Sequence, residues 1–264
     1  MRRILIAAIL ALAPLAAFAP LAAFAQTEQQ TLVDRATLSV QEMLSDQNAS
    51  DARKLLVDAK GAMVCPRVFK AGFILGGQGG DCVLVSRGPS GWSSPAFYNI
   101  GSGSIGLQIG VQDAEILFIV LTEKGLQALL DSQFKIGADA SIAVATIGAG
   151  VGGSTTAALR ADIVAIAQAR GLFAGISLDG SLISSKSDWN QSYYGKPLAA
   201  QQIVMGGEGN NPGADPLKDM LAKYAAPATA AAAPMTAPMA APTASAAPTG
   251  AIGQTPLAPP PPPR

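Results

Sequence analysis

The sequence contains no histidine, so it lacks the side chain most often used for acid–base catalysis at neutral pH and the commonest zinc ligand. Two cysteines are too few for a structural zinc site made of thiolates alone. G-x-S-x-G is absent, and one S-x-x-K match, Ser132 to Lys135, lacks the K-T-G and S-D-N motifs that accompany it in β-lactamases. Carboxylates are scattered. These absences predict a protein that is not an enzyme and holds no metal and no cofactor.

The chain also lacks an excess of charge of either sign. Eighteen basic residues balance eighteen acidic ones, which argues against a nucleic-acid partner because such proteins carry a basic footprint. The basic residues gather in one stretch, between Asp51 and Lys70, where five of them outnumber Asp51 and Asp58 by three. They are Arg53, Lys54, Lys60, Arg67 and Lys70.

Apolar residues alternate with these five basic ones, as in a segment that lies at a membrane interface. Each basic side chain adds about 1 kcal/mol of attraction to an anionic membrane. We therefore predict that the five residues bind anionic lipids or a membrane surface. An ordinary solvated helix face over a buried stripe is the alternative.

Long apolar runs are absent except at the N-terminus. Arg2 and Arg3 precede an apolar run, and Ala23-Phe24-Ala25 forms a small-x-small cleavage site. Residues 1–25 are therefore predicted to be a signal peptide, cleaved between Ala25 and Gln26. The alternative is an uncleaved anchor, but two prolines interrupt the run before the roughly 20 residues that a span needs. We expect an exported protein, periplasmic or extracellular, with a peripheral location at a membrane as a further alternative.

Residues 225–264 consist almost entirely of Ala, Pro, Thr and Met, and end in LAPPPPPPR. Such a segment buries too little side chain to offset its ordering entropy, so it is predicted to be disordered. It is either a solvated tail or a spacer and ligand for a protein partner in the envelope. The sequence thus divides into the signal peptide, one folded domain over 26–206, a linker with a short helix over 207–224, and the tail.

Cys65 and Cys82 form an even pair in a protein expected in an oxidising compartment, which favours a disulfide. Two buried thiols are the alternative.

The order of elements favours an α+β fold. Apolar periodicity predicts helices over 28–46 and 51–60, followed by strands over 71–76 and 82–87 that flank a loose glycine-rich loop. Further strands follow at 107–112 and 115–121, with a helix over 123–131 and weak helices at 198–205 and 215–224. Because regular β-α alternation is absent, we predict N-terminal helices packed on a largely antiparallel, Gly-rich sheet or partly closed β-barrel.

Two stretches match the dinucleotide-binding pattern G-x-G-x-x-G: GSGSIG from Gly101 to Gly106 and GAGVGG from Gly148 to Gly153. The pattern needs a helix that opens at its last glycine, and LQIGVQ after Gly106 has the period of a strand instead. We therefore expect no nucleotide partner and interpret GSGSIG as a bend between two segments of the sheet.

Four longer stretches together resemble the SYLF domain family. They are DAKGAMVCPRVFKAGFILGGQGGDCVLVSR (58–87), GWSSPAFYNIGSGSIGLQIG (91–110), GADAS (137–141) and RGLFAGISLDGSLI (170–183), followed by Asn190 and Tyr193-Tyr194-Gly195. The resemblance covers roughly residues 30 to 205. The chain departs from the family pattern at Thr146 to Gly150 and at Ile166 to Ala169.

The resemblance implies a binding module. Eukaryotic SYLF proteins bind phosphoinositide membranes, partly through a basic amphipathic N-terminal region, and yeast relatives also bind and bundle actin. The five basic residues fall in the corresponding region of this chain. By this resemblance we expect a non-enzymatic lipid-binding module of the bacterial envelope, or alternatively an envelope protein-interaction module.

Overall fold

The computed structural model describes residues 27–72, 75–105, 110–146, 160–171, 178 and 180–226. The predicted signal peptide and its cleavage site at Ala25 and Gln26 lie outside these residues. So do GAGVGG and the proline-rich segment from residue 227 onward.

The helix predicted at the start of the domain is confirmed as α1 (Glu28–Ser45). Thr27 caps it, because its side-chain oxygen accepts a hydrogen bond from the Gln30 amide at 3.2 Å. A short turn, η1 (Gln47–Ala49), leads into α2 (Ser50–Val57), which confirms the second predicted helix. The apolar stripe of α1, including Val33, Val40 and Leu44, is fully buried.

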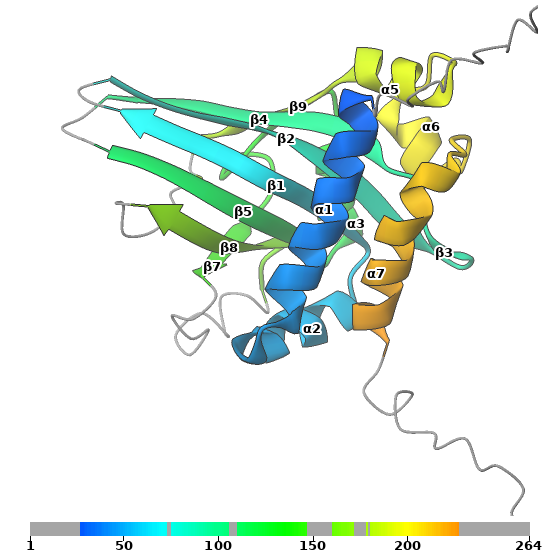
Figure 1. Ribbon diagram of the computed structural model, residues 1–264, viewed down its shortest axis with the longest axis horizontal. Helices are drawn as coiled ribbons and strands as arrows, with labels where there is room; N and C mark the ends of the chain where they lie inside the picture. Colours follow the sequence, from blue (N-terminus) through cyan, green and yellow to red (C-terminus); the bar gives the residue numbers. More distant parts are fainter. Residues whose placement is uncertain are drawn as a thin grey trace, which may run out of the picture. The chain divides into compact units, whose positions relative to one another are not determined.

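The strands form one curled, open sheet (Figure 1). They are β1 (Gly61–Gly72), β2 (Leu75–Gly88), β3 (Gly91–Trp92), β4 (Ala96–Ile105), β5 (Gly110–Val120), β6 (Gln133–Lys135), β7 (Ile142–Thr146), β8 (Ile163–Gly171) and β9 (Leu182–Ser185). Their order is β6-β9-β4-β2-β1-β5-β8-β7, and β3 pairs with β2. All pairs are antiparallel except β7 with β8, so the predicted α+β class with a largely antiparallel sheet is confirmed.

Two glycine-rich segments are strands, contrary to the sequence-based predictions. Residues 76–81, expected as a loop, lie inside β2 and pair with β1 on one side and β4 on the other. GSGSIG was expected as a bend, but residues 101–105 continue β4. Glycine is unfavourable in an isolated strand. Here backbone hydrogen bonds from both neighbouring strands hold it in extended form, and period-2 analysis cannot detect a strand without side chains.

The sheet has a hydrophobic core on each face. On one face Val64, Val83 and Leu117 pack against α1, α2 and the C-terminal helix α7 (Asp215–Ala225). On the other face Met63, Leu84 and Phe118 pack with α3 (Glu123–Leu130), α6 (Ala200–Val204), β6 and β9. Figure 1 shows α1 and α7 lying side by side across the front of the strands.

A change of register divides β1 into two halves. The pairing of β1 with β2 and with β5 shifts around Cys65 to Val68, which is a β-bulge. Before the bulge, residues 61–65 are buried; after it, Arg67 and Phe69 are exposed. The halves of β1, β2, β4 and β5 beyond the bulge extend past α1 (Figure 1). We call this part of the sheet the glycine end.

The C-terminal elements complete the helical face. α5 (Ser187–Tyr194), which the sequence analysis missed, precedes α6, and η3 (Pro212–Ala214) leads into α7. The stretch expected as a linker thus contains α7, whose Leu217 and Leu221 are fully buried in the core shared with α1. Gln30 of α1 joins the two ends of the domain: its side chain donates to the Gly213 carbonyl at 2.9 Å and accepts from the Tyr193 hydroxyl at 3.0 Å.

Candidate functional site: a groove beside α1

A groove runs between α1 and the sheet. It consists of three hollows of about 260, 390 and 330 Å³ that share lining residues. Arg35 lines all three, and Pro66 and Arg67 line the first two. We call it the α1 groove. Its lining comprises Glu28, Thr31, Leu32, Arg35, Leu38, Ser39 and Glu42 of α1, Pro66, Arg67 and Phe69 of β1, Gly79 to Asp81 of β2, Asp113 to Glu115 of β5, Gln168 of β8 and Trp189 of α5.

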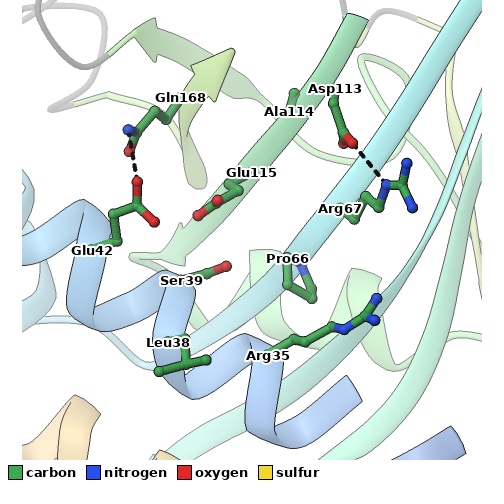
Figure 2. Close-up of a pocket in the computed structure, with 10 residues that line it drawn as sticks. All are labelled: Arg35, Leu38, Ser39, Glu42, Pro66, Arg67, Asp113, Ala114, Glu115 and Gln168. Carbon is green, nitrogen blue, oxygen red and sulfur yellow. Dashed lines mark hydrogen bonds and ion pairs between the residues drawn. The ribbon is translucent and has the colours of Figure 1, made fainter. Parts of the chain in front are cut away.

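Two arginines from different elements line the middle of the α1 groove. Arg35 is exposed on α1, and among the described residues no hydrogen bond or ion pair holds its guanidinium group. Arg67, on β1, donates from Nε to Asp113 Oδ2 at 2.7 Å, and its guanidinium carbon lies 5.9 Å from the centre of the Phe69 ring. Figure 2 shows both guanidinium groups on the same side of the first hollow.

Carboxylates line the opposite side of that hollow. Glu42 of α1 and Glu115 of β5 lie there in Figure 2, and the Gln168 amide donates to Glu42 Oε1 at 3.4 Å. At the far end of the groove, Asp81 forms an ion pair with Lys186 at 2.9 Å, and the Lys186 ammonium lies 3.0 Å from the centre of the Trp189 ring. The first hollow therefore has its two arginines on one side and the carboxylates of Glu42 and Glu115 on the other.

Exposed apolar side chains gather on the same side of the sheet. Leu38 lines the first hollow with 63% of its surface exposed, and Phe69 lines the second with 42% exposed. Strand pairing places Phe69 opposite Gly79 of β2 and Asp113 of β5. Alternation along these strands puts Leu75, 70% exposed, and Val111, 52% exposed, on that face as well. A groove with charged walls thus opens onto an apolar, glycine-floored surface.

The structure separates the five predicted lipid-binding residues. The Arg53 guanidinium donates to the carbonyls of Leu44 at 2.6 Å and Asp46 at 2.9 Å, so it closes the C-terminus of α1. Lys54 is 77% exposed beside Asp51, at 3.0 Å. Lys60, between α2 and β1, lies 3.9 Å from Glu123.

Arg67 and Lys70 are only three residues apart on β1 but face opposite sides of the sheet. Arg67 lines the α1 groove, whereas Lys70 lines a small hollow on the other face with Val68, Gln78 and Gln112. Of the five predicted residues, the structure therefore brings Arg67 alone to the α1 groove.

Arg35 was not among the predicted residues, although it is the basic side chain common to all three hollows. On the sequence it is an isolated charge in an amphipathic helix, with no basic neighbour to mark it. One sequence signal was available: Leu38, one turn later, is an apolar residue outside the buried stripe of the helix.

Cys65 and Cys82 are fully buried on the neighbouring strands β1 and β2, at the bulge. Their sulfur atoms lie at disulfide distance and their Cα atoms are 4.2 Å apart. The pair borders the core on the face opposite α1.

Among the described residues, no three Cys, Asp or Glu side chains are grouped closely enough to hold a metal ion. Burial raises the pKa of the Tyr193 and Tyr194 phenols, which keeps both neutral as hydrogen-bond donors. Among the same residues, none of the helices has the length and apolar character needed to cross a bilayer.

Fold and groove together define an α+β domain with an amphipathic groove on one face. Residues 101–224 match the family described as "Ysc84: Las17-binding protein actin regulator". This match runs from β4 through α7, so it includes the groove residues of β5, β8 and α5 but not those of α1, β1 and β2, among them Arg35 and Arg67. This part of the chain is therefore similar to the Ysc84 family, in agreement with the resemblance of the chain to SYLF domains.

Three curated relatives of the chain are eukaryotic proteins. The chain is 31% identical over 187 residues to an SH3 domain-containing protein of Schizosaccharomyces pombe, covering 69% of this chain and 42% of that protein. It is 29% identical over 154 residues to SH3 domain-containing YSC84-like protein 1 of Homo sapiens, covering 58% and 45%. With LAS seventeen-binding protein 3 of Saccharomyces cerevisiae it shares 29% identity over 167 residues, covering 62% and 36%. The chain spans less than half the length of these relatives.

Proposed function

We propose that this domain is a non-enzymatic module that binds the surface of a membrane containing anionic phospholipids in the cell envelope. The observation that carries the proposal is a set of four exposed apolar side chains on one face of the domain. Leu38 and Phe69 line the α1 groove with its two arginines, and Leu75 and Val111 lie farther along the same face of the sheet. Exposed apolar groups beside cations are the combination that an interfacial protein needs.

The basic and apolar residues have different roles in this proposal. Lys54, Lys60 and Arg35 attract the domain to anionic head groups, an effect that salt weakens. Phe69 and its apolar neighbours enter the boundary between head groups and acyl chains, and this contribution persists in salt. Lys70 faces away from the groove and contributes through its charge alone. Export of the protein and a Cys65–Cys82 disulfide are part of the same proposal.

Flotation with liposomes tests the proposal. We expect binding to phosphatidylglycerol-containing vesicles at low salt and weak binding to pure phosphatidylcholine. Arg35→Gln is expected to lower partitioning about fivefold, since each basic residue contributes about 1 kcal/mol. Phe69→Ala should lower binding equally at low and high salt, whereas the Arg35 effect should shrink with salt.

Lys135→Gln is the matched control, because it removes the same charge from an exposed position on the edge strand β6. A second variant, Lys54→Glu with Lys60→Glu, tests the basic segment without Arg53, whose guanidinium group holds the end of α1. Absence of binding to anionic vesicles at low salt would sink the proposal.

A protein-interaction module is the second candidate. The matching family is described as Las17-binding, and relatives carry SH3 domains in their names. In this alternative the proline-rich tail reaches an envelope partner. Deleting residues 228–264 distinguishes the two: vesicle binding that is unchanged by the deletion supports the lipid function of the domain.

A further inference from the structure

The glycine end of the sheet carries a trough on the face that α1 covers elsewhere. Four glycines of two paired strands form its floor, so the floor has no side chains: they are Gly77 and Gly79 of β2 and Gly101 and Gly103 of β4. Strand pairing places Phe69 beside Gly79 on one side of the floor and Leu182 beside Gly101 on the other. Leu75 follows at the far end, on β2. We call this surface the glycine trough.

The glycine trough is apolar at its sides and open above its floor. Leu182 is 40% exposed, and Phe69 and Leu75 are exposed as well. Three strand spacings of about 4.8 Å separate β1 from β9, so the side walls stand about 14 Å apart along the sheet. Four residues at about 3.3 Å each give a length of about 13 Å from Gly79 to Leu75. Among the described residues, nothing lies within 4 Å of a Cβ atom added at Gly103.

The two arginines of the α1 groove lie at the end of the trough nearest α1. Arg67 precedes Phe69 by two residues on the same face of β1, and both line the second hollow with Arg35. The carboxylate that lines this hollow, Asp81, is paired with Lys186 at 2.9 Å. A ligand complementary to the hollow and the trough together carries an anion at the end of an apolar chain.

We propose that the glycine trough holds one acyl chain of an anionic phospholipid whose phosphate lies at the guanidinium groups of Arg35 and Arg67. This inference rests on the proposed membrane function and deepens it, because the domain then holds a single lipid molecule as well as lying on a membrane surface. Guanidinium groups donate several N–H bonds in a plane and bind phosphate oxygens well. An acyl chain needs apolar contact and no hydrogen bonds, which the walls and the glycine floor provide.

A segment of another protein fits the glycine trough less well than an acyl chain does. β2 pairs with β1 and with β4 along the floor, so the backbone groups of Gly77 and Gly79 are used within the sheet and cannot pair with an added strand. The anchoring side chains of a protein partner also need pockets, and a floor without side chains offers a smooth surface instead. An acyl chain requires neither a free strand edge nor a pocket for each side chain.

Lysophosphatidylglycerols with one short chain, used as monomers below their critical micelle concentration, test the proposal without a bilayer. Isothermal titration would compare the hexanoyl, octanoyl and decanoyl lipids, with glycerol 3-phosphate as the free head group. A chain on an open floor buries about half of its surface, so we expect the affinity to rise about twofold for each added CH₂ group. Glycerol 3-phosphate should bind much more weakly than the decanoyl lipid, because it lacks the chain.

Two substitutions that fill the floor test where the chain lies. Gly77→Val and Gly103→Val are expected to remove most of the dependence on chain length, because a branched side chain takes the place of the acyl chain and is compatible with a strand. Gly88→Val is the matched control on β2, outside the trough: an added Cβ atom lies 3.8 Å from its nearest neighbour there, as it does at Gly77.

A charge variant tests the other end of the lipid. Arg35→Gln should weaken the binding of each lipid about fivefold and leave the dependence on chain length unchanged. Circular dichroism and thermal melts of each variant establish that it is folded.

The outcomes distinguish this inference from the function on which it rests. If flotation on anionic vesicles is intact, an affinity that does not depend on chain length, or a dependence that both floor variants keep, overturns the trough proposal alone. Loss of flotation in the unmodified chain removes the membrane function itself. Glycerol 3-phosphate bound as tightly as the decanoyl lipid, or a dimer of this chain that Gly77→Val dissociates, also overturns the assignment of the trough to an acyl chain.

Discussion

Asp162 joins three elements through one carboxylate. Its Oδ1 accepts from the Thr122 hydroxyl at 2.8 Å, and its Oδ2 accepts from the Ser141 hydroxyl at 2.8 Å and the Ser141 amide at 3.1 Å. Thr122 caps α3, Ser141 precedes β7, and Asp162 precedes β8. These hydrogen bonds, those from Ser141 foremost, lower the pKa of Asp162 to about 2, and Lys124 at 3.4 Å adds to the effect.

The low pKa makes the contribution of Asp162 dependent on pH. A carboxyl group whose pKa is depressed by folding stabilises the fold above its unfolded pKa of about 3.9. That contribution is lost as the pH falls toward and through about 2. Asp162→Asn is therefore expected to cost about 2 kcal/mol at pH 6 and progressively less between pH 4 and 2. Urea denaturation at several pH values measures this difference, and a deficit independent of pH would contradict it.

Among the elements, β2 shows what a glycine-rich strand requires. A Cβ atom added to Gly80 would lie 2.2 Å from the Arg67 carbonyl oxygen, because the β-bulge brings the two backbones together. At Gly103, on β4, nothing lies within 4 Å of an added Cβ atom. The two glycines occupy the same end of the sheet but differ in the space around them.

This difference gives a matched pair of substitutions. We expect Gly80→Ala to lower the free energy of unfolding by about 1–3 kcal/mol, because the backbone of β1 must shift. Gly103→Ala should leave stability nearly unchanged or slightly higher. Thermal melts of both variants test the pair; equal effects would mean that the close approach at Gly80 does not constrain the strands.

Helices and strands could be predicted from the sequence only where apolar side chains recur with a regular period. The predicted helices at 28–46 and 123–131 agree with α1 and α3 almost to the residue, since apolar residues recur with helical spacing within each: Leu32 and Val40 in the first, and Leu126 and Leu130 in the second. β2 and β4 were mispredicted over their glycine runs, where alternation has no side chains to appear in. The five basic residues are neighbours in the sequence, but strand alternation and a helix cap separate them. Arg35 and Arg67 line the same groove only because α1 packs on β1.

The whole domain is closed by contacts between distant parts of the chain. Gln30 binds Gly213 and Tyr193, and Leu221 of α7 is buried with α1, so the folded unit extends beyond the boundary at 206 expected from the sequence. Within the same molecule, the sulfur atoms of Cys65 and Cys82 lie at disulfide distance between strands that are adjacent in the sheet.

We predict that Cys65 and Cys82 form a disulfide in the exported protein. We expect protein purified from an oxidising compartment to show no free thiol after denaturation without reductant. Reduction should lower the free energy of unfolding by about 3 kcal/mol, as for a closed loop of similar length. Thiol alkylation followed by mass spectrometry counts the free thiols, and denaturation with and without reductant measures the change in the free energy of unfolding. The double variant Cys65→Ala with Cys82→Ala should not respond to reductant; two alkylated thiols in the exported protein would contradict the prediction.

The bulge at Cys65 to Val68 separates two kinds of pairing between β1 and β2. A slip of one residue before the bulge would turn Met63 and Val64 to the wrong faces, and both cores would lose their side chains. Beyond it, the same slip would move one side chain of residues 76–80, that of Gln78, to the other face, and would otherwise exchange one glycine for another at a smaller cost. The alignment of the glycine end is therefore specified elsewhere, by the side chains before the bulge and by the cysteine pair beside it. The glycine end can remain almost free of large side chains because the residues before the bulge and the cysteine pair determine where each strand lies.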